Sequence, residues 1–517
     1  MQAMPLFFLQ PGYGLVLFLA SAAALVLEIV AGRLLAPYVG MSLYTWTAII
    51  SVVLAGLSLG HWIGGRLAEG VGPLGGRRRV AGALGLAALA SAGVQPVLRL
   101  LAGPLLGLDW NPVVAIVALA AAAFVLPSLF AGIVSPILVK LAVDAAGPER
   151  AARVIGRMFA LGAAGSILGT LAAGYVFLSR IGSAGTLWAM SGLYAALALA
   201  LLADQRRALA VGAALLVLAG GGLAALPQAF ASPCLRESDY YCLRVEDFSR
   251  QSGRESAVLV LDHLGHGIND AAQPGLLYSS YLDFTDRMAA RRFGRGRIAA
   301  FFIGGGAFTL PRAWSRAFAE PHLLVAEIDP AVTALAHDRL WLERDAPGLA
   351  VVHRDARAVL QSLPASPRFD VVLGDAFHDI GIPPHLVTRQ FHGEIARRLK
   401  PGGFYALNVI ESRHRPRFLF ALLQTLGQDF AHVEVWVDGD ELSQGERITY
   451  LVLASDRASD TPILRSSSFS GRHWLRLRDD QVRARVAEAG VPDLTDDFSP
   501  VDRLMAHVLL APEIAEK

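Results

Sequence analysis

The sequence predicts an all-α membrane bundle over residues 1–230, followed by a soluble α/β domain. From Leu15 to Leu226 charges are sparse and Ala, Leu, Gly and Val dominate, whereas after Ser232 the charge density is that of a globular protein. The overall hydrophobic fraction of 54% is high, and it comes from this uneven distribution. Beyond residue 293 the pattern of buried strand, turn and helix recurs, which is typical of a parallel sheet covered on both faces.

Length and charge narrow the function classes. A chain of 517 residues is long enough for two or three domains. The net charge of +2 gives no electrostatic reason to expect nucleic acid as a partner. The first apolar run is long enough to span a bilayer and further runs follow it, so we do not expect a cleavable signal.

Crossing a bilayer as a helix takes roughly 18 or more apolar residues. About seven stretches satisfy this requirement, so the lipid bilayer is an expected partner. They are 14–36, 43–64, 80–98, 112–136, 158–179, 184–203 and 209–226. The stretch around Pro127 and Pro136 exceeds one span and either breaks or re-enters, which leaves the count open by one.

Basic residues cluster in alternate loops, which the positive-inside rule assigns to the cytoplasm. The expected location is the cell (inner) membrane of a bacterial-type cell. With seven spans, the amino terminus lies inside and the soluble half lies outside. An eighth crossing would bring the soluble half back in. The three basic loops contain Arg66 and Arg77–Arg79, then Lys140, Arg150, Arg153 and Arg157, then Arg206 and Arg207.

Small and charged residues stand out within the spans. Glycines recur at every fourth position at 56, 60 and 64 and again at 165 and 169, which predicts close helix packing in lipid. Glu28, Arg33 and His61 interrupt apolar segments, and an ionisable group there needs a partner or a water-filled cavity. Two interpretations remain open: a substrate or cation pathway through the bundle, and a structural clamp in which Glu28 is paired with an arginine or capped by backbone.

The soluble half divides into three parts. Residues 231–292 contain two segments, 240–247 and 256–262, in which apolar and polar residues alternate, and these predict a hairpin. A pattern typical of a helix follows them. Residues 293–460 hold the repeated strand–turn–helix pattern, with two late strands near 433–437 and 450–454 as an antiparallel closure. Residues 461–517 form a C-terminal segment. The expected parallel strands are 298–303, 323–328, 350–353, 369–374 and 404–409.

A glycine run follows the first of these strands. Gly304, Gly305 and Gly306 allow a sharp turn and the close approach of a ligand. A dinucleotide fingerprint would place glycine at residue 309, where Thr309 stands, so a pyrophosphate cradle is disfavoured.

Acidic residues end the next three strands. Glu327 is placed to accept hydrogen bonds from both ribose hydroxyls. Asp355, with Ala356 beside it, can reach an adenine amino group. Asp375 is expected to point into the crevice at the ends of the strands. The alternative is that these residues are helix caps and turn residues, where Asp is favoured in any case. A ligand with ribose and adenine but no pyrophosphate suggests an S-adenosyl compound.

These residues resemble a known family. Glu237-Ser-Asp-Tyr-Tyr, the glycine run, Glu327-Ile-Asp-Pro and the Asp375 loop resemble the spermidine synthase (polyamine aminopropyltransferase) family. Glu28-Ile-Val-Ala-Gly-Arg-Leu-Leu-Ala-Pro resembles the transmembrane variant of that family. The resemblance implies a Rossmann-like, class I methyltransferase-type sheet preceded by a small β-hairpin domain, and a homodimer or tetramer.

The resemblance also implies an activity: transfer of an aminopropyl group from decarboxylated S-adenosylmethionine, a co-substrate rather than a tightly bound cofactor, to a diamine such as putrescine. Asp375 would be the catalytic base, while Glu327 and Asp355 hold the nucleoside. Tyr281 and Asp283, or else Asp286, would meet the acceptor amine. No metal site is expected.

This chain departs from the family in two places. Soluble members carry an acid directly after the glycine run, where this chain has Ala307. The loop after Asp375 reads Ala-Phe-His-Asp-Ile, and Asp379 would replace the family's second acid, displaced by one position. These departures keep open a different S-adenosyl chemistry, such as methyl transfer or donor cleavage. A membrane carrier or sensor with a binding-only soluble domain is a third interpretation, suggested by Glu28.

The cysteines bear on sidedness. Cys234 and Cys242 are the two cysteines of the chain, and two further ligands at metal spacing are missing, so zinc is not indicated. They are either inert thiols in a reducing cytosol or a disulfide on an oxidising side. The span count favours the outer (periplasmic) side, whereas the cytosolic origin of the S-adenosyl donor favours the inner side.

Overall fold

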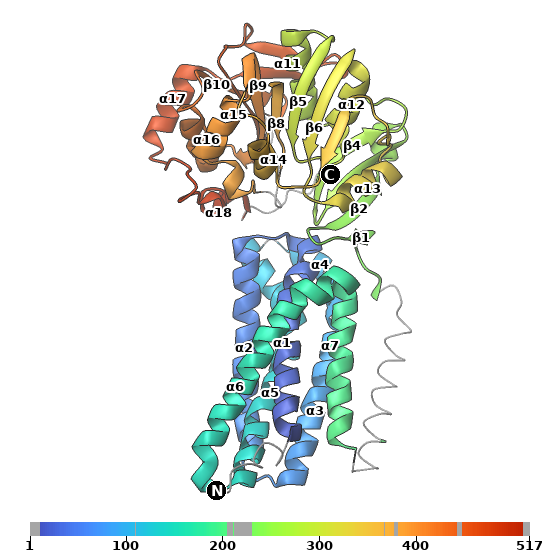
Figure 1. Ribbon diagram of the computed structural model, residues 1–517, viewed down its shortest axis with the longest axis vertical. Helices are drawn as coiled ribbons and strands as arrows, with labels where there is room; N and C mark the ends of the chain where they lie inside the picture. Colours follow the sequence, from blue (N-terminus) through green and yellow to red (C-terminus); the bar gives the residue numbers. More distant parts are fainter. Residues whose placement is uncertain are drawn as a thin grey trace. The chain divides into compact units, whose positions relative to one another are not determined.

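A computed structural model describes residues 11–108, 110–203, 210, 230–366, 368–376, 381–441 and 447–509 (Figure 1). The chain forms two compact units, Met1–Cys242 and Leu243–Lys517. The linker that follows the apolar segments therefore groups with the helical unit rather than with the sheet.

The first unit is helical. Its elements are α1 (Pro11–Val39), α2 (Leu43–Ala68), α3 (Pro73–Ala92), α4 (Val94–Leu106), α5 (Pro112–Ala146), η1 (Pro148–Arg150), α6 (Ala151–Ala172), the π-helix η2 (Ala173–Leu178), α7 (Ser179–Leu201) and the short strand β1 (Arg236–Glu237). Among the described residues, four helical runs are long and apolar enough to cross a membrane, or five if the bent pair α3 and α4 counts as one span.

This count differs from the seven predicted stretches for identifiable reasons. The predicted span 80–98 straddles Gly93, where α3 and α4 meet at a bend of 49°. The predicted spans 158–179 and 184–203 lie in one continuous helical run, Pro148–Leu201, which is broken only by the non-helical backbone of Gly182. Helix α5 continues through Pro127 and Pro136. Apart from residue 210, the predicted span 209–226 lies outside the described residues.

The glycine repeats lie where two helix pairs meet. A Cβ added to Gly60 of α2 would lie 2.1 Å from the Leu129 carbonyl oxygen of α5. One added to Gly165 of α6 would lie 2.1 Å from the Phe18 carbonyl oxygen of α1. The glycines therefore allow backbone-to-backbone contact, as predicted for helices that pack without large side chains between them.

Gly60→Ala should destabilise the helical unit by about 1–3 kcal/mol, because the new methyl group overlaps the backbone of α5. Gly65→Ala is the matched control, since a Cβ there meets nothing within 4 Å. The measurement is the thermal unfolding midpoint of the full chain in detergent. Equal midpoints for the two variants would contradict the packing.

The second unit is built on a nine-stranded mixed sheet of order β12-β13-β10-β11-β9-β8-β5-β6-β7. Strands β5 to β9 run parallel, and β10, β11, β12 and β13 add antiparallel neighbours, so the predicted antiparallel closure by β10 and β11 is confirmed. The strands are β5 (Arg297–Ile303), β6 (Glu320–Ala326), β7 (Leu349–Val352), β8 (Phe369–Gly374), β9 (Leu399–Ser412), β10 (His432–Asp438), β11 (Arg447–Ser455), β12 (Ile463–Arg465) and β13 (His473–Arg476).

Antiparallel strands precede this sheet. Strand β2 (Cys242–Asp247) pairs with β3 (Ser256–Leu261), as the alternating pattern predicts, and β3 pairs in turn with β4 (Leu264–Asp270). Strand β4 was not predicted, because its glycines at 265 and 267 are typical of a turn.

The remaining helices of this unit alternate with the strands or follow them. They are α10 (Ser249–Ser252), α11 (Ser280–Phe293), α12 (Thr309–Ala317), α13 (Pro330–Arg339), α14 (Ala356–Ser362), η3 (Pro384–Leu386), α15 (Arg389–Ala396), α16 (Arg417–Leu426), α17 (Asp479–Glu488), α18 (Val501–Leu504) and α19 (Ala506–Leu509). An apolar cluster that includes Phe301, Val372 and Leu407 from three adjacent strands forms the core of this unit.

Candidate functional site

The sheet order reverses next to β5, since β6 and β7 follow on one side and β8 on the other. In open α/β sheets, ligands bind at such a switch point, outside the carboxyl ends of the strands. Here Gly304 directly follows β5, which ends at Ile303, and Asp375 directly follows β8, which ends at Gly374. Gly304 has a φ of 93°, and a Cβ added to it would lie 3.1 Å from the Asp375 carbonyl oxygen. The turn after β5 therefore requires glycine and lies directly against the Asp375 backbone.

Glu327 follows β6 and lies under the glycine turn. Its Oε2 accepts hydrogen bonds from the Gly305 amide at 2.8 Å and the Gly306 amide at 3.4 Å. Its Oε1 accepts from the Asp329 amide at 2.9 Å. Burial raises the pKa of Glu327, and the three backbone donors oppose that shift. Oε1, which accepts from one amide only, still has a second lone pair, so the carboxylate can hold a ligand hydroxyl while it orders the turn.

The Asp375 carboxylate accepts hydrogen bonds from two polar side chains. The Tyr281 hydroxyl of α11 donates to its Oδ2 at 2.7 Å, and the Asn408 side-chain amide of β9 donates to Oδ1 at 3.2 Å. Burial raises the pKa of Asp375 to about 6, and both hydrogen bonds act to lower it. A carboxylate with this pKa is ionised at neutral pH and is still basic enough to take a proton.

Asn408 was not predicted from the sequence. It is an interior residue of β9, and its oxygen Oδ1 is buried without a hydrogen-bond partner among the described residues. Such an acceptor costs stability unless a ligand or water satisfies it. The one available signal was that Asn408 lies within the predicted strand 404–409.

Asp355 caps α14, because its Oδ1 accepts from the Ala358 amide at 2.9 Å. Its Oδ2 contacts Nε2 of His385 at 2.8 Å. Burial acts to raise the pKa of Asp355, but the hydrogen bonds from His385 and the Ala358 amide outweigh it and lower the pKa. Ala356 beside it is buried. The cap interpretation and the adenine interpretation are compatible at this residue, since the side chain stays partly exposed.

The residues predicted to meet the acceptor amine have different contacts in the structure. Tyr281 contacts Asp375, whereas Asp283 is buried in an ion pair with Arg472 and a hydrogen bond from Ser466. Asp286 is bound by both terminal nitrogens of Arg295 and by the Trp314 indole. These contacts give both aspartates a structural partner. Asp379 lies outside the described residues.

Ala307, where the family carries an acid, is enclosed by β4. Its carbonyl oxygen accepts a hydrogen bond from the Asn269 side-chain amide at 2.9 Å, and its side chain faces Gly267. Gly267 has a φ of 131°, and a Cβ on it would lie 2.8 Å from the Ala307 Cβ. Ala307 is buried, and its methyl group lies close to the backbone of β4 at Gly267.

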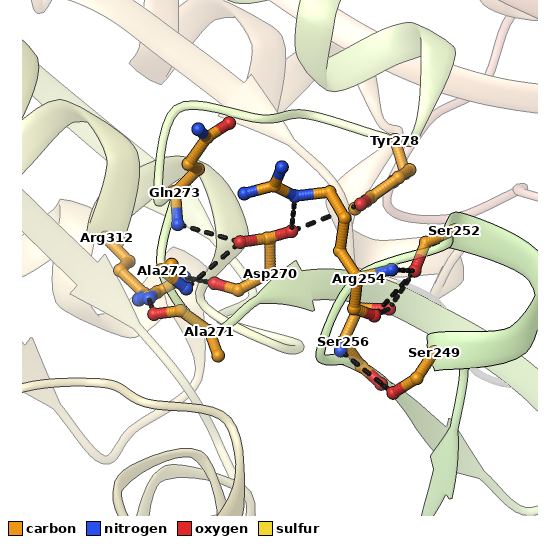
Figure 2. A network of polar contacts seen from close by, with 10 residues as sticks. All are labelled: Ser249, Ser252, Arg254, Ser256, Asp270, Ala271, Ala272, Gln273, Tyr278 and Arg312. Atoms are coloured by element: carbon orange, nitrogen blue, oxygen red, sulfur yellow. Dashed lines mark hydrogen bonds and ion pairs between the residues drawn. The ribbon is translucent and has the colours of Figure 1, made fainter.

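Polar contacts around Asp270 hold the end of β4 in this place (Figure 2). Its carboxylate accepts from Arg254 at 2.7 Å, from the Tyr278 hydroxyl at 3.3 Å and from two backbone amides that follow it. Arg312 of α12 donates to the carbonyl oxygens of Asp270 and Ala271. This network ties β4 to the helix that begins just after the glycine turn.

Gly267→Ala should destabilise the second unit by about 1–3 kcal/mol, because alanine is strained at this φ and its methyl group overlaps Ala307. Gly265→Ala on the same strand meets only the Val258 side chain at an ordinary 3.4 Å. The control should be neutral or slightly stabilising, since it lowers the entropy of the unfolded chain. Thermal unfolding of the two variants provides the comparison, and a lower midpoint for the control would contradict the account.

Among the described residues, no group of three His, Cys, Asp or Glu side chains could hold a metal ion. The side chains gathered at the switch point are instead carboxylates, a phenol and an amide. They suit hydroxyl and amine groups of an organic ligand.

Comparison with known proteins gives relatives over part of the chain. A probable polyamine aminopropyl transferase from Bifidobacterium longum is 25% identical over 289 residues, which cover 53% of this chain and 62% of that protein. A polyamine aminopropyltransferase from Vibrio vulnificus is 31% identical over 117 residues, 22% of this chain and 38% of that protein. These relatives confirm the predicted resemblance, and the chain spans less than two thirds of the length of each. No family model matches the chain.

Among solved structures, a probable spermidine synthase from Corynebacterium glutamicum superposes with a TM-score of 0.43 at 22% identity, covering 49% of this chain and 93% of that one.

Proposed function

We propose that the second unit transfers an aminopropyl group from decarboxylated S-adenosylmethionine to a diamine such as putrescine, giving spermidine and methylthioadenosine. The observation that carries the proposal is that two carboxylate residues, Glu327 and Asp375, lie against the same glycine turn. Glu327 orders the turn from below, and Asp375 adjoins it at the neighbouring strand end. The names of the two curated relatives support the same reaction.

The donor binds above the glycine turn in this proposal. Glu327 accepts a hydrogen bond from a ribose hydroxyl with the lone pair that the backbone leaves open on Oε1. Asp355, with Ala356 beside it, receives the adenine amino group at the end of β7. Because the nucleoside is released as product, the donor is a co-substrate and no tightly bound cofactor is required.

The acceptor amine approaches Asp375. Tyr281 and Asn408 hold this carboxylate in a fixed orientation, and the unpartnered Oδ1 of Asn408 is a further acceptor for an amine hydrogen. The amine nitrogen attacks the methylene carbon next to the sulfonium, the carbon–sulfur bond breaks, and its electron pair leaves sulfur neutral. The nitrogen loses a proton to Asp375. The enzyme contributes mainly this proton acceptor and the alignment of the two substrates.

The direct test is to incubate the purified full chain with decarboxylated S-adenosylmethionine and a series of diamines. The expected product is methylthioadenosine, formed only when a diamine is present and in equal amount to the new polyamine, as measured by mass spectrometry. No methylthioadenosine with any diamine would contradict the proposal.

A second candidate is another transfer from an S-adenosyl donor, such as methyl transfer. The enclosure of Ala307 favours it, because no carboxylate follows the glycine run to hold the amine of the donor. Incubation with S-adenosylmethionine distinguishes the two reactions, since methyl transfer releases S-adenosylhomocysteine.

The first unit is then the membrane domain of a cell-membrane protein. Its apolar helices support that placement by length and composition. The Cys234–Cys242 disulfide supports an outer, oxidising side for the chain that follows it. In intact cells, a membrane-impermeant thiol reagent should label these cysteines only after reduction with an impermeant reductant. Labelling that requires cell lysis would place them inside.

A further inference from the structure

Two sequence motifs that lie about 200 residues apart meet in the helical unit. Arg33 of α1 donates through Nη2 to the Ser238 carbonyl oxygen at 2.7 Å and through Nη1 to the Tyr240 carbonyl oxygen. Its Nε lies 3.9 Å from Oε1 of Glu237. The arginine that interrupts the first apolar segment is therefore bound by the linker and not by Glu28.

Glu237 has a second set of contacts, at a break in α7. Gly182 leaves the helical conformation with a φ of 65°, so the helix begins again at Ser183 with amides that lack helical partners. Glu237 accepts from the Ser183 amide at 3.0 Å and from the Ser183 hydroxyl. A Cβ on Gly182 would lie 2.9 Å from Oε2 of Glu237, so the break requires glycine. The linker thus supplies the cap of a helix distant in sequence.

The loop that makes these contacts is closed in two ways. The Ser238 hydroxyl accepts from the amides of Tyr240 and Tyr241 at 3.1 and 2.9 Å, which shapes a tight turn. The disulfide between Cys234 and Cys242 joins the two ends of the loop, eight residues apart. Upstream of it, Arg99 of α4 donates to the Ala231 carbonyl oxygen at 3.0 Å.

The contacts depend on this closure. In the described part of the chain, the hydrogen bonds of Arg33 all go to the loop, and its side chain is only 14% exposed. Two carbonyl oxygens and one carboxylate must therefore stay oriented together, which an open chain of nine residues would do only at a large cost in conformational entropy.

We propose that residues 234–242 form a redox-dependent clasp, in which the disulfide keeps Glu237 on the α7 break and the two loop carbonyls on Arg33. A dithiol opens it: the S–S bond breaks, each cysteine sulfur gains one electron and one proton, and the dithiol is oxidised to a cyclic disulfide. The opened loop then releases the Ser183 amide and the Arg33 side chain. Because Cys242 is the first residue of β2, the clasp sets where the chain leaves the helical unit.

The test is hydrogen exchange of the full chain in detergent, followed by mass spectrometry, with and without dithiothreitol. In the oxidised protein the amides of Ser183 and of residues 238–241 should exchange slowly, and reduction should speed both at least about tenfold, which corresponds to 1.4 kcal/mol. The double variant Cys234→Ser, Cys242→Ser should match the reduced protein and not respond to the reductant.

Two further variants separate the clasp from a general loss of structure. Glu237→Gln should speed exchange at Ser183 with the disulfide intact, whereas Glu246→Gln, an exposed site on β2, should change nothing. The clasp is excluded if reduction of the wild-type protein leaves Ser183 and residues 238–241 within twofold of their oxidised rates. None of these measurements uses enzymatic activity, so their outcome is independent of the proposed function.

Discussion

Asp375→Asn should lower kcat for aminopropyl transfer by about 10²–10⁴-fold, because the amide cannot take the proton that the attacking amine loses. Affinity for methylthioadenosine should stay within about twofold, since the proposed nucleoside contacts of Glu327 and Asp355 remain. The measurement pairs steady-state kinetics with calorimetry of the product. Asp338→Asn, an exposed site on α13, is the matched control and should behave as wild type.

The pH profile gives an independent check on the same residue. Since burial raises the pKa of Asp375 to about 6 and the base must be ionised, kcat/KM should rise with pH up to about 6 and then level off. Tyr281→Phe removes a hydrogen bond that stabilises the charged form, so its acid limb should move to higher pH. An acid limb that stays unmoved in Tyr281→Phe, or a persistent fast rate in Asp375→Asn, would assign the base elsewhere.

Glu327→Gln should weaken binding of methylthioadenosine by about 10–100-fold, which corresponds to the loss of one or two charge-assisted hydrogen bonds. The substituted side chain brings an NH₂ group towards the amides of Gly305 or Asp329, where only an acceptor fits. Calorimetry of the purified full chain measures the effect.

Glu320→Gln controls for this substitution, because Glu320 begins the same strand but is exposed. Unchanged affinity in Glu327→Gln would show that the nucleoside does not lie above the glycine turn, and the proposed function would fall with it.

The strand-end residues of the site were predictable because their signals are local. A glycine run and three acids follow strands at regular intervals, and parallel strands place their carboxyl ends at one edge. The structure brings Gly304 and Asp375 together there. The roles of the acids in binding and catalysis remain predictions.

Long-range relations were beyond the sequence patterns. Nothing local to Asn408 or Arg33 indicates their partners, which lie 33 and more than 200 residues away. Helix α11 carries Tyr281 and Asp283 two positions apart, and side chains at that spacing face different directions. One therefore contacts Asp375 while the other pairs with Arg472. Strand β4 contains the turn-like glycines that its packing against Ala307 requires.

The close fit of Gly304 against the Asp375 backbone has a consequence for engineering. In the proposed reaction, the backbone of the proton acceptor and the turn below the nucleoside touch main chain to main chain, and the side chains of Tyr281 and Asn408 orient the carboxylate itself. Engineering of diamine preference should therefore leave Gly304, Tyr281 and Asn408 unchanged, so that the reactive geometry stays intact.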